Sequence, residues 1–411
     1  MKRFFKTSVF FLYIIILFAS CMHPVLVTGS QQVEEEVEEP EIQETMLTLM
    51  IYMAADNDLE SYALQNLMDI KATTSERVKT LVLLDRAQGY DETDGNWTDT
   101  RLFEAGNNII TQLDCPELGL SCCTQTELDM ANHLVLKRFI EFGRTAYPAK
   151  KYALIIWGHG TGFAAAIDDK TQSYMSVHNI GLALAGTGLS VIGFDTCFGG
   201  SIETVYELKN CADYTVGSAG MTVSSGWNYS GLLQSLEECP FDSADCNKQI
   251  ALCMSGACVS GATVFQNSTL NSLAQGLEEF AKELASTITD TQSQQTVFNT
   301  LLGCKSWCYT QYPSDMFLDI YSMAQLYSQS SKASLAEAAL VLMQEASGLE
   351  AGIHFIPKLG YSTTASVHSL LYIKDGAQND QCAFVKESRW WVPTTGGKSG
   401  SLLDKLFYTV F

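Results

Sequence analysis

The chain is short of positive charge, of proline and of long apolar runs. Among its 411 residues, 25 Lys and Arg stand against 46 Asp and Glu, giving a net charge of −21. Nucleic-acid binding needs concentrated Lys and Arg at the phosphates, so a general nucleic-acid-binding protein is excluded. The 8 prolines and the 46% share of apolar residues exclude a collagen-like or largely disordered chain. Beyond the N-terminus no apolar run approaches the roughly 20 residues that span a bilayer, which excludes a polytopic membrane protein.

Several catalytic and metal-binding patterns are also missing. No GxSxG sequence occurs, which disfavours a serine hydrolase. No CxxC pair occurs, and the six histidines show neither HExxH nor HxxxH spacing, so structural zinc is not indicated. The chain has 13 cysteines, seven of them within residues 115–123 and 239–258. They permit disulfides outside the cytosol, but their connectivity cannot be deduced.

The N-terminus (residues 1–20) reads as a secretory signal peptide. A basic start ending at Lys6 precedes a short apolar stretch from Val9 to Ala19. Small residues followed at once by Cys21 resemble a bacterial lipobox, so we expect cleavage before Cys21 and its lipidation. Simple secretion and a retained anchor are the alternatives. The expected location is the bacterial cell envelope or the exterior, with membrane contact only through the lipidated N-terminus.

Composition divides the rest of the chain into three parts. Residues 21–45 are polar and rich in Glu, so they form a flexible, self-repelling linker that is anchored by lipid at its start. Residues 46–265 form the main domain. Residues 266–411 carry mostly helical patterns and form a smaller C-terminal subdomain.

Apolar strands alternate with helices in the main domain. We expect strands at residues 46–54, 78–85, 101–104, 152–157, 189–194 and 214–216, and helices at residues 59–71, 126–146, 176–185 and 201–209. Continuous apolar strands alternating with helices predict an α/β fold with a mainly parallel sheet covered on both faces. Ligands of such sheets bind beyond the carboxyl ends of the strands, so chemistry is to be sought there.

Two of these strand ends carry a histidine and a cysteine. His159 follows the strand at 152–157 between two glycines, and Cys197 follows the strand at 189–194 and precedes a helix. A helix N-terminus and a nearby imidazole would lower the pKa of the Cys197 thiol. Such a pair is the minimum equipment for thiolate attack on a carbonyl. The plainer alternatives are a disulfide partner and a structural histidine, but the joint placement at two strand ends favours chemistry.

Four segments then identify a family resemblance. They are Met50–Glu60 (MIYMAADNDLE), Leu154–Gly160 (LIIWGHG), Gly193–Cys197 (GFDTC) and Ser225–Tyr229 (SGWNY). In order and spacing, over about residues 46–235, they resemble the clostripain family of cysteine peptidases, which belongs with caspases, gingipains, legumains and separase. The resemblance implies a caspase-like α/β/α sandwich and endopeptidase activity on polypeptide substrates.

The resemblance also implies roles for single residues. Cys197 would be the nucleophile and His159 the general acid/base, with no essential third member. Backbone N–H groups of Cys197 and Gly160 would form the oxyanion hole. Asp195 matches the acid that binds Arg or Lys before the scissile bond, although an N-cap or strand-end turn explains it too.

Other positions around the implied pocket have less certain roles in the resemblance. Asn57 or Asp58 could line the cleft, or cap the helix that follows, and Thr222 is expected on the pocket wall. Ser225 stands where basic-specific relatives often have an acid, which weakens the expected preference for Arg or Lys; a small or neutral residue is the alternative.

Two further expectations follow from the family. Its members tend to cleave themselves in the loop that follows the catalytic histidine. Lys170 is the only basic residue between His159 and Cys197, although a solvated turn explains it equally. No cofactor is expected as a rule. Because clostripain itself is associated with calcium, Asp168, Asp169 or the Asp91–Asp94 region could supply oxygen ligands, but the sequence assigns no metal site.

The sequence thus predicts a monomeric, exported cysteine endopeptidase. The alternative is a catalytically silent surface lipoprotein that binds peptides or a host or protein partner. The presence of both catalytic residues counts against that alternative.

Overall fold

The computed structural model describes residues 44–162, 164–302, 305–308, 316–348 and 368–370. The predicted signal peptide, Cys21, most of the acidic linker and the end of the C-terminal subdomain lie outside these residues. Within the described residues, no helix is both long and apolar enough to cross a membrane.

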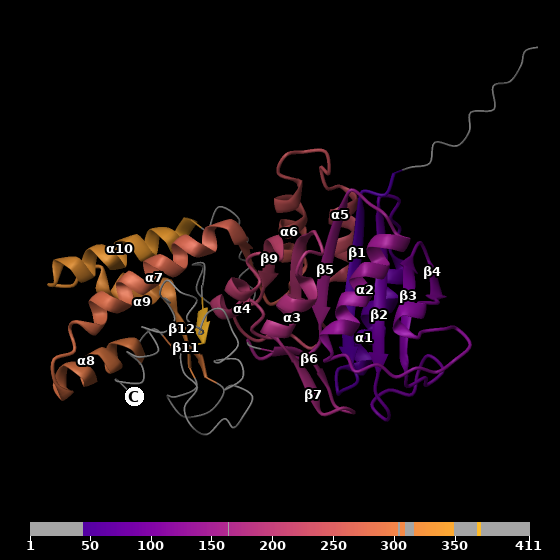
Figure 1. The fold of residues 1–411 in the computed structure, drawn as a ribbon, viewed down its shortest axis with the longest axis horizontal. Coiled ribbons are helices and arrows are strands. Elements are labelled where there is room, and N and C mark those ends of the chain that lie inside the picture. Colours follow the sequence, from indigo (N-terminus) through magenta and orange to yellow (C-terminus); the bar gives the residue numbers. More distant parts are fainter. Residues whose placement is uncertain (1–43, 163, 303–304, 309–315, 349–367, 371–411) are drawn as a thin grey trace, which may run out of the picture. The chain divides into compact units, whose positions relative to one another are not determined.

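Residues 47–266 are built on an eight-stranded sheet (Figure 1), in the order β10-β9-β8-β5-β1-β2-β3-β4. Its strands are β1 (Leu47–Ala55), β2 (Val78–Arg86), β3 (Thr100–Gly106), β4 (Ile109–Leu113), β5 (Lys151–Trp157), β8 (Leu189–Asp195), β9 (Ala212–Gly217) and β10 (Thr263–Gln266). The strands from β9 to β2 run parallel, and the other three are antiparallel additions. The predicted α/β class with a mainly parallel sheet is confirmed.

The sheet is buried on both faces because successive side chains of an apolar strand point to opposite sides. In β1, Leu49 and Ile51 belong to one core cluster, whereas Met50 and Tyr52 belong to another. The first cluster is completed by α1 (Glu60–Ala72), α5 (Tyr229–Glu237) and α6 (Cys246–Ala257), and the second by α2 (His133–Ala146) and α3 (Val177–Leu184). These two helical layers make the predicted sandwich.

Side-chain caps set where two of these helices begin. Ser176 precedes α3, and its hydroxyl accepts the N–H of Asn179. Asn132 precedes α2, and its side chain accepts the N–H of Leu134. The helix predicted from residue 126 therefore begins only at His133, because Asn132 satisfies the first free N–H groups there.

Several elements were not predicted. They are β4, β10, α5, α6 and a hairpin formed by β6 (Ala164–Asp168) and β7 (Ser173–Ser176). The hairpin follows His159 along the chain, and its turn carries Lys170. Between residues 115 and 258, the described cysteines form no disulfide.

The C-terminal part is mainly helical, as expected. Its helices are α7 (Leu270–Ala285), α8 (Thr291–Leu302), α9 (Ile320–Tyr327) and α10 (Ala333–Gly348). A small sheet contains β11 (Lys305–Cys308), β12 (Met316–Asp319) and β13 (His368–Leu370). One-turn 3₁₀ helices precede α7, at Asn267–Thr269, and follow β4, at Pro116–Leu118. Its core includes Ile202 and Val205 of α4 (Ile202–Glu207) and Phe265 of β10. The described residues all belong to one compact unit, and the predicted boundary after residue 265 stays a prediction.

Candidate active site

The carboxyl ends of β1, β5 and β8 lie side by side in the sheet. In the register of β5 and β8, Trp157 pairs with Asp195. His159 and Cys197 each follow two residues after this pair, and the N–H of Gly158 donates to the carbonyl of Asp195 (3.3 Å). The fold therefore brings the two predicted reactive residues to neighbouring positions on one sheet edge.

The two glycines beside His159 allow this close approach. Gly158 has φ +133°, and a Cβ there would lie 2.8 Å from the carbonyl oxygen of Ala54. A Cβ on Gly160 would lie 2.6 Å from the carbonyl oxygen of Cys197 and 2.7 Å from the side chain of Thr196. A side chain at Gly160 would push the histidine segment away from the cysteine segment, and one at Gly158 would push it away from the end of β1.

The segments after His159 and Cys197 are also joined by side chains of α4. Ser201 caps this short helix by accepting the N–H of Thr204. The hydroxyls of Ser201 and Thr204 both donate to the carbonyl of Gly162, at 2.9 and 2.7 Å. These buried residues were missed in the sequence, where only the start of a helix was visible, and they fix the loop after His159 against the cysteine segment.

Cys197 is half-buried and its sulfur faces Thr222. The N–H of Thr222 donates to Sγ at 3.4 Å, and the Thr222 hydroxyl lies 3.6 Å from Sγ. The predicted helix N-terminus is not adjacent to the sulfur, because α4 begins at Ile202, five residues later. The polar groups that face the sulfur therefore come from Thr222, in another segment, and not from the helix end.

The residue after Cys197 has an unusual backbone conformation. Phe198 has φ +57°, in the left-handed region that non-glycine residues rarely adopt. Its N–H donates to the carbonyl of Gly220, and the N–H of Gly200 donates to the carbonyl of Ser218, both at 2.8 Å. Such a turn is maintained only because the surrounding contacts hold it, and strained residues of this kind cluster at functional sites.

His159 contacts a carboxylate at the end of β1. Its Nε2 lies 2.6 Å from Oδ1 of Asp58, and the two side chains are 38% and 67% exposed. The contact leaves Nδ1 as the other ring nitrogen for chemistry. From the sequence, Asp58 is expected only as a cleft or capping residue, because spacing along the chain gives no sign of this contact.

Asp195 is 3% exposed and lies beneath the segment at residues 225–229. Its Oδ2 accepts the N–H of Trp227 (2.9 Å) and the hydroxyl of Tyr229 (3.0 Å). Its Oδ1 is buried and, among the described residues, has no hydrogen-bond partner. Burial raises the pKa of Asp195 to about 7, although the two hydrogen bonds act in the opposite direction.

Ser225 and Asn57 occupy different surroundings. Ser225 is exposed, and its carbonyl accepts a hydrogen bond from Asn66 of α1, which also accepts one from the indole of Trp157. Asn57 is buried; its amide donates to the carbonyls of Ala54 and Ile167, and its oxygen accepts the N–H of Leu59. Asn57 thus uses its hydrogen-bonding groups to join the end of β1 to the β6–β7 hairpin.

Lys170 lies in the β6–β7 turn and contacts an acid. Its ammonium is 2.6 Å from Glu127, and this hydrogen bond raises the pKa of Lys170. Two buried acids, Asp56 and Asp85, lie nearby: burial and the neighbouring acids raise the pKa of Asp56 to about 6, and burial raises that of Asp85 well above its usual range.

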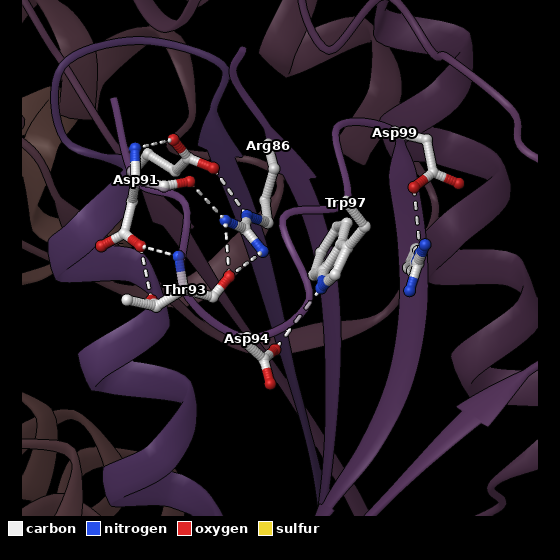
Figure 2. Close-up of polar contacts among 8 residues, drawn as sticks. Arg86, Asp91, Thr93, Asp94, Trp97 and Asp99 are labelled. Atoms are coloured by element: carbon white, nitrogen blue, oxygen red, sulfur yellow. Dashed lines mark hydrogen bonds and ion pairs between the residues drawn. The ribbon is translucent and has the colours of Figure 1, made fainter. Parts of the chain in front are cut away.

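The Asp91–Asp94 loop is organised by a buried arginine (Figure 2). The Arg86 guanidinium pairs with Glu60 at 2.6 Å, with both side chains fully buried, and donates to the carbonyls of Asp91 and Thr93. It also lies over the ring of Trp97, at 4.7 Å from the centroid. The carboxylate of Asp91 accepts the N–H of Thr93. These loop acids are therefore engaged in folding the loop itself.

Comparisons with known proteins agree with this architecture. The sequence model of the clostripain family matches residues 51–354. Clostripain of Hathewaya histolytica is 25% identical over 223 residues, which are 46% of this chain and 42% of the relative. The chain thus spans less than half the length of that relative.

Two solved structures share the fold. A secreted C11 cysteine protease from Bacteroides thetaiotaomicron, in complex with an irreversible peptide inhibitor, has a TM-score of 0.57 at 18% identity, covering 84% of this chain and 98% of that one. An inactive zymogen C11 protease from Parabacteroides distasonis has a TM-score of 0.57 at 18% identity, covering 90% and 96%. Because the family match extends over most of the chain and the sheet has the expected topology, this protein belongs to the clostripain family of cysteine peptidases.

Proposed function

We propose that this protein is a cysteine endopeptidase that cleaves peptide bonds through Cys197 and His159. The observation that carries the proposal is the meeting of their two segments at one sheet edge, with Gly160 against the Cys197 carbonyl. A thiol and an imidazole that come from neighbouring strand ends supply the groups needed for nucleophilic attack on a carbonyl.

The chemistry follows from these groups. His159 takes the thiol proton, and the Cys197 sulfur forms a bond to the carbonyl carbon of the substrate. Backbone N–H groups of Cys197 and Gly160 stabilise the oxyanion. The carbon–nitrogen bond breaks as His159 returns the proton to the leaving amine. Water then attacks the thioester, with His159 as base, and releases the acid product and the thiol.

Asp58 acts in this proposal as a positioning residue for His159. A carboxylate 2.6 Å from Nε2 favours the tautomer that carries its proton on Nε2, so Nδ1 is free to accept the thiol proton. The negative charge also favours the imidazolium formed after that transfer. The dyad expected from the family resemblance would thus gain a third member.

We also propose a preference for Arg or Lys before the scissile bond. The support is Asp195, two residues before Cys197, whose Oδ1 is buried without a partner among the described residues. A guanidinium that reached this oxygen would form a charge-assisted hydrogen bond, worth about 1.5–3 kcal/mol or roughly 10- to 100-fold in selectivity. Because Asp195 lies beneath residues 225–229, this segment must shift to admit the basic side chain, and Thr222 would line the wall beside it.

Two measurements test this function. An irreversible thiol-reactive peptide should label the folded protein at Cys197, and Cys197→Ala should abolish both labelling and peptide cleavage. An inert Cys197 in folded protein would refute the peptidase and favour the binding lipoprotein. Parallel fluorogenic peptides ending in Arg, Lys, Ala and Asp then test specificity: cleavage after Ala as fast as after Arg would refute the basic preference alone.

The proposed protein is exported and acts as a monomer on polypeptides. The support for export is the signal-peptide pattern that precedes Cys21, together with the secreted C11 protease that shares the fold. Mass spectrometry of protein from a bacterial host should find a lipidated Cys21 at the N-terminus. An unmodified Cys21, or a cut elsewhere, would refute the lipid anchor.

A further inference from the structure

Four cysteines are concentrated around α5 and α6. Cys239 follows α5, Cys246 and Cys253 lie in α6, and Cys258 comes directly after α6. All four carry free thiols in the structure. The two helices belong to one core cluster with the sheet, and the cysteines lie in that cluster or beside it. The proposed peptide cleavage uses none of these thiols.

Cys253 faces the last turn of α5. Its Sγ donates to the carbonyl of Ser235 at 3.5 Å. Cys239 follows Ser235 by four positions, about one helical turn, and its N–H donates to the carbonyl of Leu236 at 3.1 Å. Because the chain keeps turning past the end of α5, Cys239 reaches the side of this helix on which Cys253 lies.

The thiols of Cys239 and Cys253 contact each other. The Cys239 thiol donates a hydrogen bond to the Cys253 sulfur, which raises the pKa of Cys239 and lowers the pKa of Cys253. Cys239 is buried, whereas Cys253 is only half-buried. The pair thus combines a sulfur that solvent reaches, and that ionises more easily, with a second sulfur held beside it. This combination favours disulfide formation.

The other two cysteines of this region offer a poorer partner. Both Cys246 and Cys258 are buried. The Cys246 sulfur lies 3.4 Å from the side-chain oxygen of its own neighbour, Asn247. Burial, and then the negative charge of Asp195, raise the pKa of Cys258 to about 12. Neither supplies an accessible thiolate for reaction with an oxidant, so the region favours one pairing.

We propose that Cys239 and Cys253 form a stabilising disulfide in the exported protein. The Cys253 thiolate attacks one sulfur of a disulfide donor, such as oxidised glutathione or an oxidised thiol–disulfide oxidoreductase, and the first donor thiol leaves. The Cys239 thiol loses its proton and attacks the Cys253 sulfur of this mixed disulfide, and the second donor thiol leaves. The two cysteines lose two electrons and two protons, and the donor gains them.

The bond would hold α5 to α6 at a second point. At the start of α5, the N–H of Asn228 already donates to the carbonyl of Ala257, at 2.9 Å. The disulfide would join the other end of α5 to α6 and so support the segment that lies over Asp195. This inference rests on the proposed export, because exported proteins meet oxidants whereas cytosolic thiols stay reduced. It does not rest on the peptidase activity.

The pairing is tested on the full chain carrying Cys197→Ala, which cannot cleave itself. The protein is exported to the envelope of a bacterial host, and free thiols are alkylated before purification. Proteolytic cuts after Lys248 and before Asp242 place Cys239 and Cys253 on separate peptides, and tandem mass spectra assign the linked sulfurs. We expect this link in most chains, and also after reduced protein is treated with oxidised glutathione. Free thiols at both positions in either preparation, or another partner for either cysteine, would overturn the proposal.

Urea unfolding measures the stabilisation. A closed loop of about 15 residues restricts the unfolded chain, so the oxidised protein should have a folding equilibrium constant about 100-fold larger than the reduced protein. Cys253→Ser, a change at the half-buried position, should abolish this difference. Cys246→Ser is the matched control in the same helix and should keep it. Equal stability of the oxidised and reduced parent, or a difference that persists in Cys253→Ser, would contradict the proposed bond.

Discussion

Asp58 and His159 form a contact whose value must lie in orientation rather than in stability. Both side chains are partly exposed, and exposed ion pairs contribute little to the free energy of unfolding. A carboxylate that fixes the tautomer and angle of a catalytic imidazole can nevertheless have a large effect on rate, because misaligned general bases lose most of their advantage.

Replacing Asp58 with Asn should reduce kcat/KM by about 10- to 100-fold while leaving KM and the unfolding free energy nearly unchanged. The control is Asp242→Asn, since Asp242 also forms an exposed pair, with Lys150. If both variants keep the parent kcat/KM, Asp58 does not position His159.

At the scale of secondary-structure elements, two loops at the edge of the sheet are held in place by buried polar side chains. The loop between β2 and β3 is held by Arg86, and the loop after His159 is held by Ser201 and Thr204 of α4. Each of these two sets of hydrogen bonds depends on a buried polar group whose partner comes from another part of the chain. Removing one partner leaves the other unsatisfied, which costs more than the contact itself contributes.

Arg86→Met should therefore destabilise the fold by about 3–5 kcal/mol, because Glu60 remains buried without its cation. The measurement is urea unfolding in the Cys197→Ala background. Adding Glu60→Gln should recover part of the loss, since the two changes act on one pair. Arg101→Met is the control: Arg101 also lies over Trp97, at 4.4 Å, but is partly exposed. Equal losses for Arg86→Met and Arg101→Met would contradict the role of burial.

The hydrogen bonds from Ser201 and Thr204 to the carbonyl of Gly162 form a tether for the loop after His159. Their effect can be measured separately from the effect of helix capping. Ser201→Ala should cost about 1 kcal/mol of stability as a lost cap and also lower kcat/KM several-fold, because the loop after His159 loosens. Ser176→Ala removes a similar cap from α3 and should reduce stability alone. Thr204→Val, which removes a donor to Gly162 but not the cap, should lower kcat/KM as well. Full activity in both α4 variants would show that the loop needs no tether.

These contacts also show which features the sequence could reveal. The apolar strands β1, β2, β5 and β8 were predicted within a residue or two, because they are buried on both faces and read as continuous apolar runs. The short hairpin β6–β7 and the strand β4 were missed, since they are half-exposed or only four or five residues long. Their existence depends on tertiary contacts rather than on a local pattern.

The site divides in the same way. His159 and Cys197 could be found because each follows a recognisable strand, and their approach follows from the order of strands in a parallel sheet. The partners of Asp195 could not, because Trp227 and Tyr229 lie more than thirty residues further along the chain. The cluster of Asp56, Asp85 and Glu127 could not be predicted from the sequence either, because its members come from three segments.

At the scale of the whole molecule, the buried carboxyl of Asp195 links folding to pH. Its pKa of about 7 in the folded protein exceeds that of an exposed Asp, about 3.9, so the folded state holds this proton more tightly. Between these values the folded protein binds more protons than the unfolded chain, and stability falls as pH rises. The effect is complete only above the folded pKa, where the buried group must ionise.

In the Cys197→Ala background, stability should therefore decline between about pH 4 and 8, and Asp195 should account for up to about 4 kcal/mol of that decline. Asp195→Asn keeps an acceptor for Trp227 and Tyr229 but cannot ionise. The variant should thus lose this share of the pH dependence, so that its stability relative to the parent improves steadily as pH rises. Urea unfolding at several pH values measures the difference, and Asp213→Asn, at an exposed acid, should follow the parent throughout. A difference between Asp195→Asn and its parent that stays constant from pH 4 to 8 would mean that the buried carboxyl titrates like an exposed one. In that case the charge available to a basic substrate side chain would already be present at acidic pH.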